Sequence, residues 1–269
     1  MAAGDRDGEA ATFVAAQPRA PLRLLLCHLY PDLLNIYGDR GNVLALRRRA
    51  AWRGIAVEVR EATTGEPVAW RDVDLLCMGG GEDDKQSLAA SDLRPRADGL
   101  GDAVAAGLPV LAVCGSYQLL GRYYQPAAGP RLDGAGVFDA YTEAGARRMI
   151  GNVAVTSAFG MLTGFENHSG RTFLGPSCER LGTIVGRGGG NNGSDGGEGA
   201  RVGNCIGTYL HGSLLPKNPA LADFLLNAAL ERRYGVERAS EAMRPLDDGI
   251  EHAANVQGQR WAAQRRAVW

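Results

Sequence analysis

Near the middle of the chain stands Val110-Leu111-Ala112-Val113-Cys114-Gly115-Ser116-Tyr117-Gln118-Leu119-Leu120-Gly121. Its first four residues form a short apolar run with two β-branched valines, which is typical of a buried strand, and a helix-compatible segment follows without a linker. Cys114 stands at the junction. The pattern therefore predicts a strand, a sharp turn and a helix, with the geometry of a nucleophile elbow.

Cys114 is the candidate nucleophile of this stretch. A side chain at such a turn is held out of the sheet, and the positive end of the helix dipole behind it favours thiolate over thiol. Gly115 has no side chain and so permits the backbone to turn tightly. The alternative interpretation is that Cys114 is an inert cysteine at the end of a core strand.

The composition favours one α/β domain over two small ones. The chain has 269 residues, of which 45% are hydrophobic, enough to bury a full core. Its net charge of −1, from 29 basic and 30 acidic side chains, gives no field that would attract nucleic acid or an anionic membrane. No run approaches the roughly 18 apolar residues of a membrane span. The five cysteines are odd in number and widely spaced, so we expect reduced thiols, a cytoplasmic protein and no metal site.

Three segments are expected to lie outside the packed core. Residues 1–20 lack the basic and apolar regions of a signal peptide, and we predict a disordered leader. Residues 234–269 fit a disordered end or a docking segment equally well, which leaves 21–233 as the domain. The glycine-rich segment 186–199 cannot bury enough apolar area to order itself, so we predict a mobile loop.

In the first half of the chain, predicted strands alternate with helices. The apolar runs predict strands over residues 22–29, 55–59, 73–78 and 110–113, and a helix over 40–53 that ends at Gly54. This alternation predicts an α/β fold with a mainly parallel sheet flanked by helices on both faces. Beyond Gly121, β-like runs at 136–138, 149–156, 171–174 and 181–185 predict an antiparallel extension of the sheet.

Two more predicted strands end on candidate site residues. Strand 73–78 runs into Gly79-Gly80-Gly81, whose N–H groups can point into a crevice and hold an oxyanion, whereas no phosphate-loop lysine follows. The run 206–210 ends on His211, which can take the thiol proton and later protonate a leaving amine. Because strand ends in an open sheet share one crevice, we expect these groups to face Cys114. His168, in a turn-rich segment, is the rival of His211.

Together these motifs resemble type 1 glutamine amidotransferases of the cobyric acid synthase-like (CobB/CobQ-like) branch, over roughly residues 21–233. The motifs are Gly-Gly-Gly-Glu-Asp after a strand, Val-Cys-Gly-Ser-Tyr-Gln-Leu-Leu-Gly, and Gly-Thr-Tyr-Leu-His-Gly-Ser-Leu-Leu-Pro-Lys-Asn. The segments 148–152 and 163–172 are similar to the GatD family, the glutaminase subunits of lipid II isoglutaminyl synthase. The resemblance implies a flavodoxin-like fold.

The resemblance also implies a role for each site residue. Cys114 would attack the side-chain amide of L-glutamine, His211 would carry the proton, and the N–H groups of Gly81 and Gly115 would hold the oxyanion. Arg148 would bind the substrate carboxylate, because its two N–H groups match two carboxylate oxygens. Gln118 would be a further substrate-binding residue. No cofactor is implied in this chain.

A partner subunit is implied as well. GatD acts with MurT, a Mur-ligase-like subunit that uses ATP, with Mg, to activate the D-glutamate α-carboxylate of lipid II in peptidoglycan synthesis. This chain has no nucleotide-binding motif, so a heterodimer is expected. One alternative is a cobyric acid synthase-like amidotransferase in cobalamin biosynthesis. Another is a non-catalytic assembly subunit, against which the intact pair of Cys114 and His211 argues.

The residues after His211 depart from the pattern of many type 1 amidotransferases. Those enzymes read His-Pro-Glu and use the glutamate to orient the histidine, whereas this chain reads His211-Gly212-Ser213. Two sources of an orienting group are open. An acidic residue of the partner would make the glutaminase dependent on the complex, and a carboxylate or carbonyl elsewhere in this chain would not.

Overall fold

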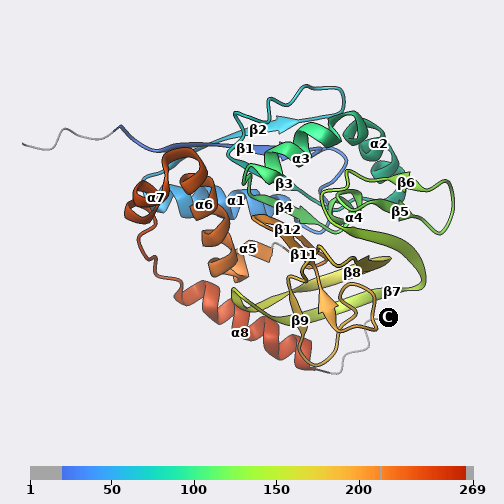
Figure 1. Ribbon diagram of the computed structural model, residues 1–269. Helices are drawn as coiled ribbons and strands as arrows, with labels where there is room; N and C mark the ends of the chain where they lie inside the picture. Colours follow the sequence, from blue (N-terminus) through green and yellow to red (C-terminus); the bar gives the residue numbers. More distant parts are fainter. Residues whose placement is uncertain (1–19, 213, 265–269) are drawn as a thin grey trace, which may run out of the picture.

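The computed structural model describes residues 20–212 and 214–264. The predicted leader, apart from residue 20, and the last five residues of the predicted tail lie outside the described residues. In chain order (Figure 1) the elements are β1 (Arg23–Leu29), α1 (Arg40–Trp52), β2 (Ala56–Ala62), β3 (Leu75–Met78), α2 (Asp83–Leu93), the 3-10 helix η1 (Arg94–Arg96), α3 (Ala97–Ala105), β4 (Val110–Val113), α4 (Gly115–Leu119), β5 (Tyr123–Gln125), β6 (Leu132–Asp133), β7 (Ala140–Ser157), β8 (Gly160–Leu174), β9 (Gly182–Ile184), β10 (Gly197–Glu198), β11 (Ala200–Val202), β12 (Cys205–Thr208), α5 (Leu214–Lys217), α6 (Pro219–Tyr234), α7 (Val236–Ala242) and α8 (Gly249–Ala263).

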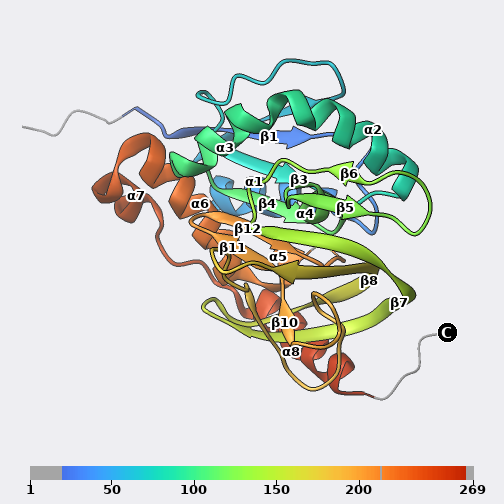
Figure 2. The ribbon, with the colours of Figure 1, turned by 45° about the vertical axis from the view of Figure 1, so that its right-hand side comes forward.

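The first sheet has six strands in the order β11-β12-β4-β3-β1-β2. Its strands pair in parallel except for β11, which is antiparallel to β12. The parallel part follows the flavodoxin-like order, in which the connections from β1 and β3 run in opposite directions across the sheet. Helices α2 and α3 consequently cover one face, and α1 and α6 cover the other (Figures 1 and 2). The predicted α/β class with a mainly parallel sheet is confirmed.

The strands from β5 to β10 form a second sheet, antiparallel except for the parallel pair of β5 and β7, whereas we expected an antiparallel extension of the first sheet. Their order is β10-β9-β7-β5-β6, and β8 pairs with β7 in a long hairpin. A bridge between Phe165 in β8 and His211 joins the hairpin to the end of β12. The expected strand at 136–138 is absent, because Phe138 turns inward and packs its fully buried ring on Tyr117, with the ring centroids 5.6 Å apart.

The strands at the centre of the first sheet are buried on both faces. Every residue of β3, β4 and β12 is buried, which explains why these runs are continuously apolar and do not alternate with polar residues. These buried strands all end at the same edge of the sheet, the edge formed by their carboxyl ends. None of the described helices combines the length and apolarity that crossing a membrane requires.

The segment after Tyr234 contains two helices, and α8 packs against the hairpin of β7 and β8 (Figure 2). Asn255 in α8 donates from Nδ2 to the carbonyl oxygen of Met161, at 2.9 Å. Just before α8, Asp248 pairs with Arg49 of α1, with 2.6 Å between Oδ1 and Nη1. The described part of this tail is therefore packed onto the domain through buried polar contacts.

The glycine-rich segment 186–199 is held in place by side chains, whereas we expected a mobile loop. The carboxylate of Glu166 accepts hydrogen bonds from the N–H groups of Gly189 and Gly190, at 2.8 and 2.9 Å. Asn191 is fully buried, and its N–H donates to the carbonyl of Gly197 at 2.9 Å. Composition alone misses this arrangement, because polar contacts to the segment's backbone replace the apolar burial that it lacks.

Candidate active site

The candidate residues gather where four neighbouring parallel strands end. Asp39 comes from the loop after β1, the glycine turn (Gly79 to Gly81) follows β3, Cys114 follows β4, and His211 lies three residues beyond β12. In an open α/β sheet, the crevice outside the carboxyl ends of the strands is deepest where the connections diverge, which is here between β1 and β3.

Cys114 has the backbone geometry that the sequence predicts. It stands between β4 and α4 with φ of 52° and ψ of −104°, in a region that a residue with a side chain seldom adopts. Its N–H donates to the carbonyl of Thr208 at 2.8 Å, which ties the elbow to the end of β12. Such strain is maintained only where the surrounding structure imposes it, and it is common at functional sites.

Gly80 lies between Cys114 and His211. A Cβ atom added at Gly80 would lie 2.7 Å from Cε1 of His211 and 3.2 Å from Cβ of Cys114. The two side chains therefore approach each other across this glycine, and any larger residue would force them apart. The structure brings Cys114 and His211 together as expected, and it adds a steric role for Gly80 that the sequence analysis missed.

Asp39 orients His211 from within the same chain. Its Oδ1 lies 3.1 Å from Nδ1 of His211, and its Oδ2 accepts the N–H of Gly80 at 2.7 Å. Both side chains are buried, and the other ring nitrogen of His211, Nε2, has no hydrogen-bond partner among the residues that the structure describes. Of the two sources that the sequence leaves open, the structure offers a carboxylate of this chain itself. The available signal for Asp39 was an acidic residue in the loop after the first strand.

His211 is held in its protonated form at neutral pH. Burial favours the neutral ring, but the Asp39 carboxylate and the Cys114 sulfur outweigh it and raise the pKa of His211 to about 10. In this form both ring nitrogens carry a proton, and the proton on Nε2, the nitrogen not bonded to Asp39, is available to the reaction at Cys114. A leaving amine needs such a proton.

Glu198 supports the segment just before His211. Its Oε1 accepts hydrogen bonds from Oγ1 of Thr208 and from the N–H of Tyr209, at 3.0 and 2.7 Å. Its Oε2 is buried without a partner. Burial raises the pKa of Glu198 to about 7. This carboxyl group was not among the predicted site residues.

Two backbone N–H groups next to Cys114 have no acceptor among the described residues. Among the described residues, neither the N–H of Gly81 nor that of Gly115 donates a hydrogen bond. They belong to the turns after β3 and β4, beside Cys114. These groups remain available to hold an oxyanion, which is the role predicted for them.

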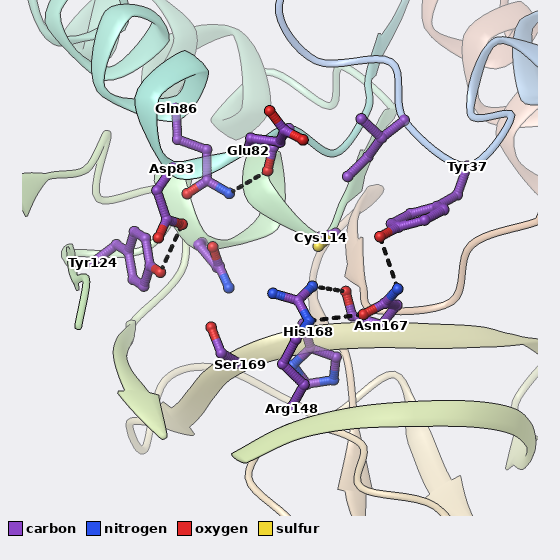
Figure 3. A pocket seen from close by; sticks show the side chains of 13 residues that line it. Tyr37, Glu82, Asp83, Gln86, Cys114, Tyr124, Arg148, Asn167, His168 and Ser169 are labelled. Atoms are coloured by element: carbon purple, nitrogen blue, oxygen red, sulfur yellow. Dashed lines mark hydrogen bonds between the residues drawn. The ribbon is translucent and has the colours of Figure 1, made fainter. Parts of the chain in front are cut away.

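A cavity of about 560 Å³ opens in front of Cys114 (Figure 3). Arg148, exposed on β7 next to an irregularity in the pairing with β8, reaches it from the second sheet. Its Nε and Nη2 donate to Oδ1 and to the backbone oxygen of Asn167, both at 2.9 Å. Asn167 in turn donates from Nδ2 to the hydroxyl of Tyr37 at 2.7 Å (Figure 3). The arginine predicted to bind the carboxylate thus lies at the cavity, with its Nε and Nη2 already bonded to Asn167.

Gln118 and His168 also line this cavity. The amide of Gln118 donates to the hydroxyl of Tyr209 at 3.1 Å and leaves its Oε1 buried without a partner. The ring of His168 stacks on Tyr209 at 3.5 Å and bonds through Nδ1 to the carbonyl of Gly170. No hydrogen bond or ring contact between described residues links His168 to Cys114, so His211 is the histidine placed for chemistry.

The remaining cysteines lie in protected positions. All five cysteines are free thiols, and Cys114 is the one that lines the cavity in front of the glycine turn. Burial raises the pKa of Cys27 to about 12 and that of Cys178 to about 11, and it raises those of Cys77 and Cys205 further. In the part of the chain that the structure describes, no three His, Cys, Asp or Glu side chains gather to hold a metal ion.

Solved structures share this fold. A structure described as a glutamine amidotransferase superposes with a TM-score of 0.54 at 20% identity, covering 76% of this chain and 98% of that one. A glutamine amidotransferase from Thermotoga maritima superposes with a TM-score of 0.50 at 16% identity, covering 90% and 98%. These likenesses concern the fold alone. The crevice of this fold holds a thiol and an imidazole side by side, an arrangement that suits acyl transfer to a thiol.

The chain belongs to the family of CobB/CobQ-like glutamine amidotransferase domains, which it matches over residues 26–219. It is 42% identical, over 213 residues, to the lipid II isoglutaminyl synthase (glutamine-hydrolyzing) subunit GatD of Staphylococcus aureus (strain N315), covering 78% of this chain and 86% of that subunit. Identity to the subunit of the same name from Streptococcus pneumoniae (strain ATCC BAA-255 / R6) is 39% over 218 residues, with 80% and 84% covered. The resemblance to GatD is confirmed.

Similarity to cobyric acid synthases is lower and covers less of those proteins. The enzyme of Nocardia farcinica (strain IFM 10152) is 34% identical over 165 residues, which are 55% of this chain and 30% of that protein. This chain therefore corresponds to a part of the cobyric acid synthase and to most of a GatD subunit.

Proposed function

We propose that this chain is a glutaminase subunit, which hydrolyses L-glutamine to glutamate and supplies ammonia for the amidation of the D-glutamate α-carboxylate of lipid II. One observation carries the proposal. Cys114, at a strained elbow, faces a histidine that Asp39 fixes, beside the two unpaired N–H groups of Gly81 and Gly115. That arrangement fits acyl transfer to a thiol.

The first half of the reaction forms a thioester. Sγ of Cys114 attacks the carboxamide carbon of glutamine, and the carbonyl oxygen takes up negative charge between the N–H groups of Gly81 and Gly115. When the carbon–nitrogen bond breaks, His211 gives its proton to the departing nitrogen, which leaves as ammonia. Asp39 stabilises the imidazolium before this transfer and keeps Nε2 directed toward the reacting atoms.

The second half hydrolyses the thioester. His211, now neutral, takes a proton from a water molecule, and the resulting hydroxide adds to the thioester carbon. The same two N–H groups hold the second oxyanion. Collapse of this intermediate releases glutamate and returns the sulfur of Cys114 beside a protonated His211, which restores the starting state.

Arg148 and Gln118 are the proposed substrate-binding residues. The α-carboxylate of glutamine has two oxygens that match the two N–H groups which Arg148 now donates to Asn167. Gln118 offers a buried amide oxygen without a partner, and this atom can accept an N–H group of the substrate. Both residues line the cavity in front of Cys114.

The acceptor half of the proposal needs a second protein. The related proteins are named as subunits of a synthase, and this chain has no nucleotide-binding motif in its sequence. We propose a heterodimer with a MurT-like, Mur-ligase-like subunit that binds ATP and Mg and activates the acceptor carboxylate. Because Asp39 already orients His211, the partner is needed for the amidation and not for the orientation of the histidine.

The test separates hydrolysis from amidation. The purified chain is assayed for glutamate formed from glutamine, alone and after addition of a MurT-like subunit, ATP and lipid II. We expect the chain alone to hydrolyse glutamine and the complex to convert the D-glutamate residue of lipid II to D-isoglutamine. Absence of hydrolysis under both conditions contradicts the glutaminase. Hydrolysis of glutamine without amidation of lipid II contradicts the proposal that lipid II is the acceptor. Amidation of a cobyrinate-type acceptor then becomes the reaction to measure.

A further inference from the structure

We propose that Gln86 is a positioning residue that fixes the two oxyanion donors, the N–H groups of Gly81 and Gly115, relative to each other. The proposal rests on the glutaminase function given above. Gln86 lies in the first turns of α2, is 3% exposed, and forms part of the wall of the cavity that contains Cys114 (Figure 3).

Gln86 holds the peptide group on one side of Gly81. Its Nε2 donates to the carbonyl oxygen of Gly81 at 3.0 Å (Figure 3). On the other side, the N–H of Ile36 donates at 3.2 Å to the carbonyl of Gly80, which belongs to the same peptide group as the N–H of Gly81. Both flanking peptide groups are thereby fixed. This matters at Gly81 because glycine has more backbone freedom than any other residue.

The same side chain touches the second donor residue. A Cβ atom added at Gly115 would lie 2.5 Å from Nε2 of Gln86, 3.0 Å from its Cδ and 3.2 Å from its Cγ. The carboxamide therefore rests against the α-carbon of Gly115. One group contacts both turns that carry the oxyanion donors, so its position sets the distance between them.

The presence of a polar side chain at this buried position supports the proposed role of Gln86. Its Oε1 is buried and has no hydrogen-bond partner within residues 20–212 and 214–264. An unpaired buried amide oxygen is unfavourable, and an apolar side chain of similar length would fill the space without that penalty. What the position gains from glutamine is therefore the N–H donor that holds Gly81.

The experiment compares three variants of the full-length chain with the wild type. Gln86→Met keeps the length of the side chain and removes the donor. Gln86→Glu keeps the shape, but its carboxylate cannot donate to Gly81 and places negative charge next to the oxyanion. Gln125→Glu is the matched control, because that amide also donates to a backbone carbonyl, of Pro126, and does not line the cavity. Glutaminase kcat and KM are measured from pH 5.5 to 9, with thermal unfolding of each variant.

We expect kcat of Gln86→Met to fall by about 10- to 100-fold while KM changes by less than about threefold, because oxyanion donors act on the transition state. The kcat of Gln86→Glu, divided by that of the wild type at the same pH, should rise toward low pH, since the protonated carboxyl group can donate to Gly81. This ratio should stay flat for Gln125→Glu. A merely structural role would not lower the kcat of the uncharged Gln86→Met while KM and thermal unfolding stay unchanged.

Wild-type kcat in both Gln86 variants overturns the proposal, as does a rise in KM alone. A loss of kcat that follows the loss of folded protein, with a ratio independent of pH, overturns it as well. If Gln86→Met does not fold, the isosteric Gln86→Glu decides through its pH profile. A wild-type chain that fails to hydrolyse glutamine contradicts the proposed function, whereas normal hydrolysis that does not depend on Gln86 contradicts only this inference.

Discussion

Replacing Asp39 by asparagine should nearly abolish glutamine hydrolysis while leaving the fold intact. In the structure, one carboxylate oxygen faces Nδ1 of His211 and the other accepts the N–H of Gly80. Asparagine has one acceptor oxygen and an NH₂ group. Either His211 or Gly80 would therefore face a donor, and the ring would turn or change its tautomer.

The size of the loss in kcat follows from the pKa of His211 and from comparable catalytic sites. The pKa of His211 is raised from 6.5 to about 10, which corresponds to a preference of about 5 kcal/mol for the protonated ring, divided between Asp39 and Cys114. Losing the orienting acid of a comparable catalytic assembly lowers the rate by up to ~10⁴-fold. We expect kcat of Asp39→Asn to fall by about 10³- to 10⁴-fold.

The pH dependence gives a second, independent signature. A raised histidine pKa keeps the ring protonated until the pH passes that value, so wild-type activity should extend toward pH 10. Without the carboxylate, the pKa of His211 falls and the proton for the leaving ammonia is lost at lower pH. The alkaline decline of kcat in Asp39→Asn should therefore move down toward neutral pH.

The assay is steady-state formation of glutamate between pH 6 and 10, by the chain alone and with the proposed MurT-like subunit. Asp32→Asn is the control, because Asp32 lies exposed in the same loop and should leave kcat unchanged. A kcat for Asp39→Asn within about tenfold of the wild type, with an unchanged alkaline limb, would refute the assignment. Activity of Asp39→Asn that returns only when the partner is added would show that a group of the partner orients His211.

Three further predictions follow from the same site. Cys114→Ser should abolish glutamine hydrolysis without lowering the melting temperature by more than a few degrees, and retention of most activity would exclude Cys114 as the nucleophile. Arg148→Ala should raise KM for glutamine by the equivalent of about 1.5–3 kcal/mol, the range for hydrogen bonds to a charged group, because Arg148 is exposed. Arg148→Lys should restore little because it lacks the planar fork, and an unchanged KM would assign the substrate carboxylate to another residue. Glu198→Gln should flatten the dependence of stability on pH. The pKa of Glu198 is raised to about 7, so its contribution is complete below about pH 4.5 and is lost as the pH rises through 7. Between pH 5 and 8 the free energy of unfolding of the wild type should accordingly fall by about 3 kcal/mol relative to Glu198→Gln, measured by denaturant titration, and parallel curves would contradict this.

The sequence predicts the parts of the site that are attached to strand ends. Cys114 and His211 each follow an apolar run, and the carboxyl ends of parallel strands lie at one edge of a sheet, so local pattern and sheet geometry together place them. The same reasoning could not predict that the later strands form a separate sheet. Alternation marks a strand as half-buried, but it does not say which strand will be its neighbour.

Asp39 was harder to predict, because its role depends on a contact with a residue 172 positions away. It lies in a loop, where no periodicity limits the direction of a side chain. Gly80 shows a related limit. The glycine triplet suggested backbone freedom and an oxyanion role for Gly81, whereas the need for glycine at Gly80 comes from the side chains of Cys114 and His211 on either side of it.

The pairing of Arg148 with Asn167 makes recognition of glutamine at the Nε–Nη2 edge of the guanidinium an exchange reaction. Before the substrate arrives, Nε and one N–H of Nη2 already have good acceptors on Asn167, whose amide is held in place by Tyr37. The affinity gained from Arg148 is then the difference between two sets of hydrogen bonds and not the strength of one. Release of glutamate gains from the reverse exchange, because Asn167 takes back the guanidinium as the product leaves. The same arginine can in this way select a carboxylate without retaining it, which suits the proposed role of a subunit that releases glutamate and supplies ammonia.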